Sequence, residues 1–577
     1  MEAALGIIGA VGVVGQIFDG CMKAYRIFTT AANQGRDSER LVCKIRIEEA
    51  RLGVWGREWG VVEGKLEANL AAADWGPPGL YTLAETILSQ LYSTIMDFNK
   101  LQDRYGLREA TPGSVDREAY KNSEDPRSSV AARLRDGLTL RARWVVVDKE
   151  KFEVLLEDLG YYNDRLEKLF PPERISTFQR TWTNELLDAT QRNVQNLDLL
   201  ENASSGKYPR LNALAKLKHL RINLDAQAPS KKILSTSELK VPRWRLTFDG
   251  ATDSARIHGV YQRPTDALKN GQVSEEIPVL IDFISYEHYQ DMDTRLHLYQ
   301  RVDNLARMLH SASNRHPDLH TLDCLGYVDD TAASRYGIIH MLPESIPKSP
   351  ASPSFLSLST VMDDNTRRTP DLDARFRLAH SLAIALWSFH SLDWLHKAFY
   401  PSNILFFPPP PAESGSTPSH HNLDHPFVLG FDSSRPEHLS EMSAAAQPSP
   451  AHLPDLYRHP DSLGIWRQSY RKAYDIYSLG LVLLEIGLWS KITGYWKQKY
   501  SSAVFKQRLL SGIVPHVGSK AGSKYRTVVE RCLKYGDAPD SQESNGNEKE
   551  GETKNETTIP PNQMMEWVVM SLEKLSV

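Results

Sequence analysis

At 577 residues the chain is too long for a single hydrophobic core, so two or three domains are expected. Charged residues at 24% and hydrophobic residues at 41% are ordinary for a soluble protein, and a net charge of −4 excludes a general attraction to nucleic acid. The four cysteines form no CxxC pair, which argues against a disulfide framework or a zinc site and indicates a reducing, cytoplasmic environment. Glu2 argues against a cleaved signal peptide and against N-myristoylation.

Residues 3–18 are almost entirely apolar, and Gly6, Gly9, Gly12 and Gly15 recur at every third position. Each glycine weakens a soluble helix by up to about 1 kcal/mol relative to alanine, so stability alone does not explain the segment. Small residues let helices approach closely in a bilayer, and the run is at the short end of the roughly 17–25 residues that span one. We therefore expect a membrane-active segment that is buried as a bundle helix in the resting protein.

Residues 1–225 have the apolar periodicity of an all-α helical bundle. One stretch shows spacings that alternate between three and four, as in a helix packed in a bundle, and Pro171 and Pro172 are expected to end it. Its apolar residues are Phe152, Leu155, Leu159, Tyr162, Leu166 and Leu169. Further helices are expected at 36–60, 80–104 and 177–203, with a loop at 108–128.

The pattern changes near residue 230, where short β-prone runs begin. Strands are expected at 245–248, 257–261 and 277–283, a helix at 294–311, strands near 322–327 and 335–342, and then mostly helices. The Ser/Pro-rich stretches at 344–370 and 408–426 are expected to be flexible. The Glu/Asn/Gly-rich segment at 537–562 is expected to be disordered, with a C-terminal helix at 563–577.

Residues 395–405 read Leu-His-Lys-Ala-Phe-Tyr-Pro-Ser-Asn-Ile-Leu and resemble the catalytic loop H-R-D-L-x-x-x-N of protein kinases. His396 and Asn403 hold the positions that the motif requires, but Ala398 falls where the catalytic Asp should be. A methyl group cannot accept the proton of a substrate hydroxyl. The resemblance therefore implies a kinase-like fold that has lost its chemistry, in which His396 and Asn403 hold the loop together.

Two further landmarks of the kinase family follow in the expected order. Tyr474-Asp475-Ile-Tyr-Ser-Leu-Gly480 is similar to the start of the long buried helix of the C-lobe, which implies that Asp475 accepts hydrogen bonds from the catalytic-loop backbone. Residues 457–461 are similar to the A-P-E region, which implies a structural ion pair between Asp461 and Arg531.

The positions that would bind nucleotide and metal depart from the kinase pattern. The D-F-G position reads Gly430-Phe-Asp432, so glycine stands where the metal-binding Asp belongs, and Asp432 as a displaced ligand is the less favoured reading. The run at 279–284 lacks the lysine of V-A-I-K, the helix at 294–311 offers Asp303 but no Glu, and no glycine-rich loop precedes them. Since Asn403 alone does not hold Mg²⁺, we expect no catalytic residue, no metal and no cofactor, and ATP binding is doubtful.

Three N-terminal stretches carry a second resemblance. They are Cys21-Met-Lys-Ala-Tyr-Arg-Ile-Phe28, Gly35-Arg-Asp-Ser38 and Glu48-Glu-Ala-Arg-Leu-Gly-Val-Trp-Gly-Arg57. Together they resemble the fungal HeLo domain, the prion-inhibition and propagation domain of heterokaryon-incompatibility proteins. The resemblance implies a helical bundle that guards a hydrophobic N-terminal segment, which permeabilises membranes as an oligomer on activation. The family's C-terminal amyloid segment is not evident, and the layout is similar to that of mixed-lineage kinase domain-like pseudokinases.

The sequence thus predicts a multidomain protein, with an all-α helical bundle at 1–225, a linker at 226–240 and an α+β bilobal kinase-like domain at 241–536. The first functional hypothesis is a cytoplasmic fungal incompatibility or cell-death effector that self-associates, binds protein partners and is recruited to the plasma membrane. The alternatives are an atypical serine/threonine kinase with a fused bundle, and a non-enzymatic signalling scaffold. No nucleic-acid partner is expected.

Overall fold

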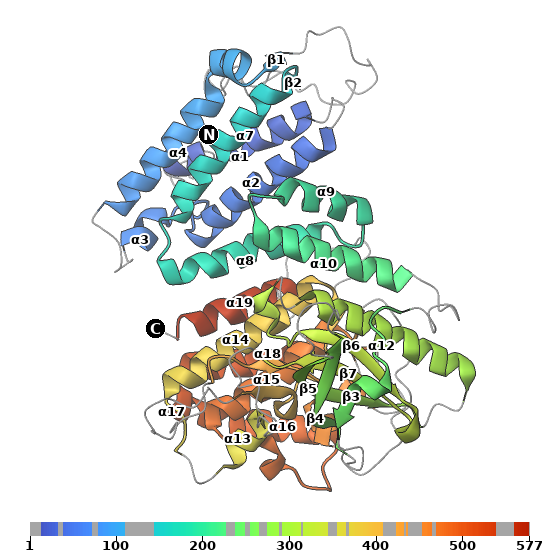
Figure 1. Cartoon of the computed structure of the whole chain (residues 1–577). Helices are drawn as coiled ribbons and strands as arrows, with labels where there is room; N and C mark the ends of the chain where they lie inside the picture. Colours follow the sequence, from blue (N-terminus) through green and yellow to red (C-terminus); the bar gives the residue numbers. More distant parts are fainter. Residues whose placement is uncertain are drawn as a thin grey trace, which may run out of the picture. The chain divides into compact units, whose positions relative to one another are not determined.

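The computed structural model divides into two compact units, Met1–Lys216 and Leu217–Val577, and each is described by itself (Figure 1). The described residues are 13–32, 38–71, 79–109, 144–226, 237–248, 254–264, 274–287, 291–312, 316–343, 355–364, 368–407, 423–431, 434–436, 453–463, 469–537 and 559–575. The boundary falls after Lys216 and not near 225 as predicted. Residues 217–226 belong to the second unit because Lys218 and Arg221 are buried against its Asp393.

The described part of the first unit is mainly helical. Its helices are α1 (Val13–Ala32), α2 (Ser38–Glu58), α3 (Leu66–Ala71), α4 (Leu80–Met96), α7 (Lys149–Glu167), α8 (Pro172–Ala189), α9 (Val194–Ser204) and the first half of α10 (Pro209–Ala226). In Figure 1, α1, α2, α4 and α7 run side by side. Phe152, Leu155 and Leu159 of α7 are buried, because the predicted apolar face packs against α2 and α4.

Two local predictions for the first unit were wrong in detail. The helix expected at 177–203 is two helices, since Gln191 takes a left-handed backbone (φ 48°) and Asn193 caps α9. As predicted, α7 ends before Pro171 and Pro172, and Pro172 begins α8 at a position where a helix tolerates proline. A short antiparallel pair, β1 (Leu107–Glu109) with β2 (Trp144–Val146), adds strands where only helices and loop were expected.

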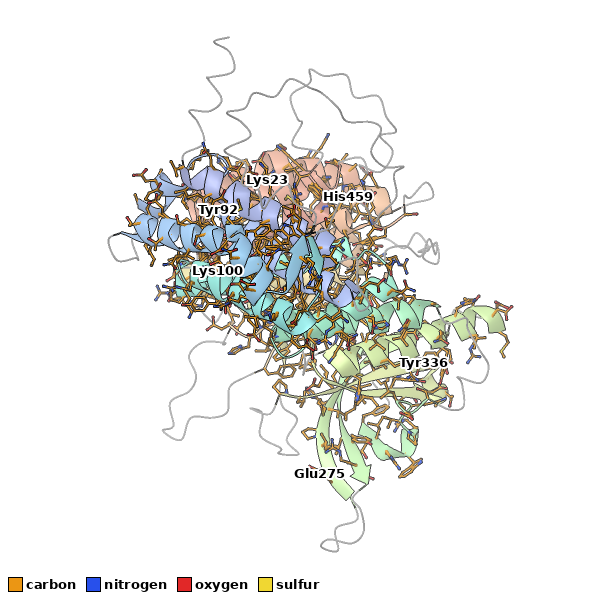
Figure 2. All side chains as sticks on the ribbon, turned by 90° about the horizontal axis from the view of Figure 1, so that it is seen from above. Lys23, Tyr92, Lys100, Glu275, Tyr336 and His459 are labelled. Atoms are coloured by element: carbon orange, nitrogen blue, oxygen red, sulfur yellow. The ribbon has the colours of Figure 1, made fainter. Side chains whose placement is uncertain are left out.

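After the second half of α10, the second unit contains a five-stranded antiparallel sheet in the order β3-β4-β5-β7-β6. The strands are β3 (Leu246–Phe248), β4 (Arg256–Pro264), β5 (Ser274–Ser285), β6 (Cys324–Asp330) and β7 (Arg335–Met341), with α12 (Met292–Ala312) between β5 and β6. Figure 2 labels Tyr336 of β7, whose ring lies 5.8 Å from that of Tyr299 on α12. Val279, Ile281 and Ile339 form the core beneath the sheet.

The predicted linker at 226–240 ends in this sheet. Val241 and Leu239 exchange backbone hydrogen bonds with Tyr327 of β6. The chain can approach so closely because Gly326 lacks a side chain: a Cβ there would lie 2.1 Å from the Leu239 oxygen. The last residues of the expected linker therefore form part of the second unit.

The remainder of the second unit is mostly helical. Its elements are β8 (Leu356–Ser357), α13 (Leu358–Asp363), α14 (Leu372–Ser391), β9 (Trp394–Leu395), β10 (Ile404–Phe406), β11 (Phe427–Val428), β12 (Arg435–Pro436), α15 (Lys472–Leu488), α16 (Ser502–Arg508), α17 (Val514–Ala521), α18 (Ser523–Tyr535) and α19 (Pro561–Glu573). β8 and α13 lie within the stretch expected to be flexible. Residues 538–558 of the segment expected to be disordered lie outside the described residues, and α19 packs on α14 and α18.

Candidate functional site

The loop between β9 and β10 is held by one buried carboxylate of α15. Asp475 accepts hydrogen bonds from the backbone nitrogens of His396 (2.8 Å) and Lys397 (2.9 Å), and from the hydroxyl of Tyr470 (2.8 Å). Burial alone would raise the pKa of Asp475, but hydrogen bonding to His390 and to the Lys397 amide holds it below its usual range. The loop conformation therefore depends on an ionised group in the helix core.

Three of the predicted positions, Asn403, Ala398 and Gly430, lie together beside this loop. The side-chain nitrogen of Asn403 donates to the Ala398 carbonyl oxygen (2.8 Å), and the backbone nitrogen of Leu429 donates to the Asn403 carbonyl oxygen (2.8 Å). Gly430 has φ 82°, and a Cβ there would lie 2.1 Å from the Asn403 side-chain nitrogen. Asn403 thus fills the space that a side chain at 430 would need, while Asp432 lies outside the described residues.

Sequence reasoning missed two residues of this site, Arg256 and Asp282, which face each other across β4 and β5. The Arg256 guanidinium pairs with Asp282 (2.9 Å) and donates to the Ser402 carbonyl oxygen (2.8 Å) and to the Asn403 side-chain oxygen (2.5 Å). The Gly430 nitrogen donates to the other oxygen of Asp282 (3.3 Å). Asp282 stands where V-A-I-K would place its lysine, a signal present in the sequence, whereas nothing in the sequence pointed to Arg256.

An aromatic cluster packs beneath the same loop. The ring of Phe431 lies 4.9 Å from that of His396, 5.6 Å from that of Phe389 on α14 and 5.5 Å from that of Trp394. His396 is 1% exposed, so its ring packs in this cluster, where its Nδ1 also accepts from the backbone nitrogen of Ala398 (3.3 Å).

The predicted ion pair between Asp461 and Arg531 is wrong. Asp461 is half exposed and lies 3.7 Å from His459, whereas the guanidinium of Arg531 lies 4.3 Å from the ring centre of Trp567 on α19. The charge pairing in this region comes instead from Lys506 and Asp537 (2.5 Å). Arg531 packs against Trp567 of α19 and not against Asp461. The sequence pattern could not indicate this contact between distant parts of the chain.

His459, Asp461 and Asp537 also bring possible metal ligands together (His459 is labelled in Figure 2). The Lys506 ammonium group, however, lies 2.8 Å from the His459 ring nitrogen and 2.5 Å from the Asp537 carboxylate. Burial would raise the pKa of Asp537, but hydrogen bonds from His459 and Lys506 lower it to about 2. Because a lysine already supplies the positive charge, we interpret this cluster as structural.

In the first unit, the motif at 48–57 forms a buried polar cluster. Arg51, 3% exposed, donates to Glu48 (3.0 Å), Asp164 (2.5 Å) and Glu167 (2.9 Å), which joins α2 to α7. The indole nitrogen of Trp55 donates to the Leu166 carbonyl oxygen (2.9 Å). The motif is therefore a clamp between helices.

Of the glycines in the apolar N-terminal segment, Gly15 is buried in α1, and Gly6, Gly9 and Gly12 lie outside the described residues. Among the helices of the described part, none is both long and apolar enough to cross a bilayer.

Comparisons with known proteins match both parts of the chain. The HeLo family, described as prion-inhibition and propagation, matches residues 6–200, which confirms the resemblance seen at the N-terminus. The heterokaryon incompatibility protein S of Podospora anserina is 23% identical over 287 residues, which cover 48% of this chain and 93% of that protein. The heterokaryon incompatibility protein s of Podospora anserina is 24% identical over 273 residues, which cover 45% of this chain and 87% of that protein.

A second family, described only as a domain of unknown function (DUF7580), matches residues 284–575. This match includes Asn403, Gly430 and Asp475 but not Arg256 or Asp282. Since it covers just over half of the sequence, the chain belongs to the DUF7580 family, with a HeLo domain preceding that region.

Proposed function

We propose that this protein is a fungal incompatibility or cell-death effector in which the HeLo unit acts on membranes under the control of a catalytically inactive, kinase-like second unit. The HeLo match and the two Podospora incompatibility proteins support the first part. The protein would be cytoplasmic at rest, self-associate on activation and be recruited to the plasma membrane through its apolar segment at 3–18.

Several features of the second unit support a kinase-like fold. A five-stranded antiparallel sheet receives one helix, α12, between its third and fourth strands along the chain, and a mostly helical part follows. Asp475 binds the backbone of the loop that carries His396, and the ring of Phe431 packs tilted against His396 and edge-on against Phe389 of α14. The Asp475 contact is the one that the sequence resemblance implied, and both contacts support a role in shape and not in chemistry.

The hydrogen bonds of the Asn403 side chain are the main support for the proposal that the second unit is catalytically inactive. Phosphoryl transfer requires a base, metal-binding oxygens and a lysine on the phosphates. Ala398 offers a methyl group, Gly430 offers no ligand, and the Asn403 amide is bound on both sides by the Ala398 carbonyl oxygen and by Arg256. The protein would therefore need no nucleotide and no metal.

The test uses the full-length protein and a Val11→Glu variant, whose site lies in the apolar segment outside the described residues. Dye leakage from liposomes by the parent but not by the variant is the expected result, since a charge at the centre of a spanning helix costs about 2.5–3.5 kcal/mol. The variant must keep the parent's circular-dichroism spectrum. Equal leakage by both proteins would contradict the role of the segment. No leakage by either, even when a substitution in the second unit has released its restraint, would favour a scaffold.

A second measurement addresses inactivity. Purified protein with radiolabelled ATP and Mg²⁺ is expected to transfer no phosphate to itself or to a general protein substrate. Transfer that disappears in an Asp432→Ala variant would instead support the atypical kinase.

A further inference from the structure

Arg256 supplies a positive charge at the meeting point of the sheet and the loop at 396–403. Each nitrogen of its guanidinium is engaged, by Asp282, by the Ser402 carbonyl oxygen and by the Asn403 side-chain oxygen. The side chains of Arg256 and Asp282 are each 14% exposed, so the contacts are made largely out of water. A planar fork that satisfies three acceptors in fixed directions is a role that lysine cannot take.

The charges at this place are the reverse of those in a phosphate-binding site. An anionic group, Asp282, stands in β5 where a lysine would neutralise phosphates, and it also accepts from the Gly430 nitrogen (3.3 Å). The cation comes from Arg256 in β4 and points at the amide that would otherwise face a metal. A triphosphate would meet the Asp282 carboxylate, and a divalent cation would meet the guanidinium.

We infer that Arg256 is an internal latch that takes the place of a bound nucleotide and keeps the sheet closed on the loop at 396–403. Arg256 lies on β4, 146 residues before Ser402 in the chain. Its contacts with Ser402 and Asn403 therefore join the five-stranded sheet directly to the loop at 396–403. Release of the latch would then be the step that changes the state of this unit. The latch rests on contacts that stand whether or not the proposed membrane function is correct.

The test compares full-length Arg256→Ala with Arg263→Ala. Arg263 is a matched control on the same strand, exposed and paired with Glu275, which Figure 2 places at the tip of the sheet. Hydrogen–deuterium exchange of peptides covering 396–406 is expected to become about tenfold faster or more in Arg256→Ala and to stay unchanged in Arg263→Ala. Arg256→Lys is expected to resemble Arg256→Ala, because it keeps the charge but loses the fork.

The outcomes separate the latch from a general loss of stability. Faster exchange confined to 396–406 and to the facing strands supports the latch, whereas equal acceleration in α15 and α18 would make Arg256 a mere core residue and overturn it. Unchanged exchange at 396–406 would also overturn it. In the same proteins, increased liposome leakage by Arg256→Ala supports release of restraint. Absence of leakage from every protein, with local exchange still altered, would defeat the membrane function alone.

Discussion

The carboxylate of Asp475 on α15 lies 2.8 Å from the backbone nitrogen of His396, although the two residues are 79 positions apart in the chain. Because Asp475 is fully buried, it is the fixed point from which the loop at 396–403 takes its shape. The loop is then completed by Asn403, which closes it on Ala398.

Loss of the Asp475 carboxylate should destabilise the second unit, and its effect should be seen in the free energy of unfolding and not in an enzymatic activity. Asp475→Ala leaves the amides of His396 and Lys397 buried and unsatisfied, which costs roughly 1–3 kcal/mol for each group. Denaturant unfolding of the full-length protein is expected to show an earlier transition for the second unit only. Asp475→Asn, which keeps one acceptor oxygen, should lie between the parent and Asp475→Ala. An unchanged transition in Asp475→Ala would contradict the anchoring role.

An aspartate placed at position 430, where the D-F-G motif has its acid, should not give the protein phosphate-transfer activity. Gly430→Asp requires φ 82°, a left-handed conformation that costs an L-residue roughly 1–2 kcal/mol, and its Cβ would collide with Asn403. We expect a lower melting temperature and no phosphate transfer. Gly494→Ala, at a position where a Cβ meets nothing within 4 Å, is the control and should change the melting temperature little. Phosphate transfer by Gly430→Asp would show that Asn403 is free to rearrange.

The buried Glu485 of α15 should make stability depend on pH. It accepts from the Tyr457 hydroxyl and from the Ile492 nitrogen (both 2.7 Å), and burial raises its pKa from 4.5 to about 7. Between these values the folded state binds more protons than the unfolded state, so the free energy of unfolding falls as pH rises from about 4.5 to 7. The full difference corresponds to roughly 3 kcal/mol.

Glu485→Gln tests this directly, because glutamine keeps the acceptor oxygen and removes the charge. The variant is expected to match the parent near pH 4.5 and to exceed it in stability at pH 8, as measured by denaturant unfolding at each pH. Burial also lowers the pKa of His340 to about 3, which reduces the free energy of unfolding at acidic pH. This effect is the same in the parent and in Glu485→Gln, so it cancels when the two are compared. Glu530→Gln on α18 is the surface control, and identical pH profiles for Glu485→Gln and the parent would contradict the assignment.

In the HeLo unit, Arg51 should matter far more than a surface arginine of the same helix. Arg51→Met leaves Glu167 buried without its cation and leaves Glu48 with only the half-exposed Lys207 (2.9 Å). Breaking one member of a buried pair costs about 3–5 kcal/mol. Arg57→Met removes a pair with Glu185 whose arginine is half exposed, which is worth about 0–1 kcal/mol. Unfolding of the first unit, followed by tryptophan fluorescence, measures both variants. Equal effects would show that the polar cluster does not clamp α2 to α7.

Local patterns were enough to predict much of this protein. The periodicity of 152–169 predicted the packed face of α7, and the run 474–480 located the start of α15, because helical periodicity and short motifs depend on near neighbours. The family of the N-terminal unit could be identified from three short stretches for the same reason. The break in 177–203 was missed, since a left-handed residue at Gln191 carries no glycine to signal it.

The tertiary structure alone decided which charges meet. Arg256 reaches Asn403 because the register of β4 against β5 sets it opposite Asp282, and that register depends on the packing of the whole sheet. The same kind of long-range packing places α19 over Arg531 and leaves Asp461 beside His459, against the pairing that the sequence suggested. Hydrogen bonds and ion pairs act over a few ångströms, whereas these partners lie tens to more than a hundred residues apart, so only the folded chain could bring them together.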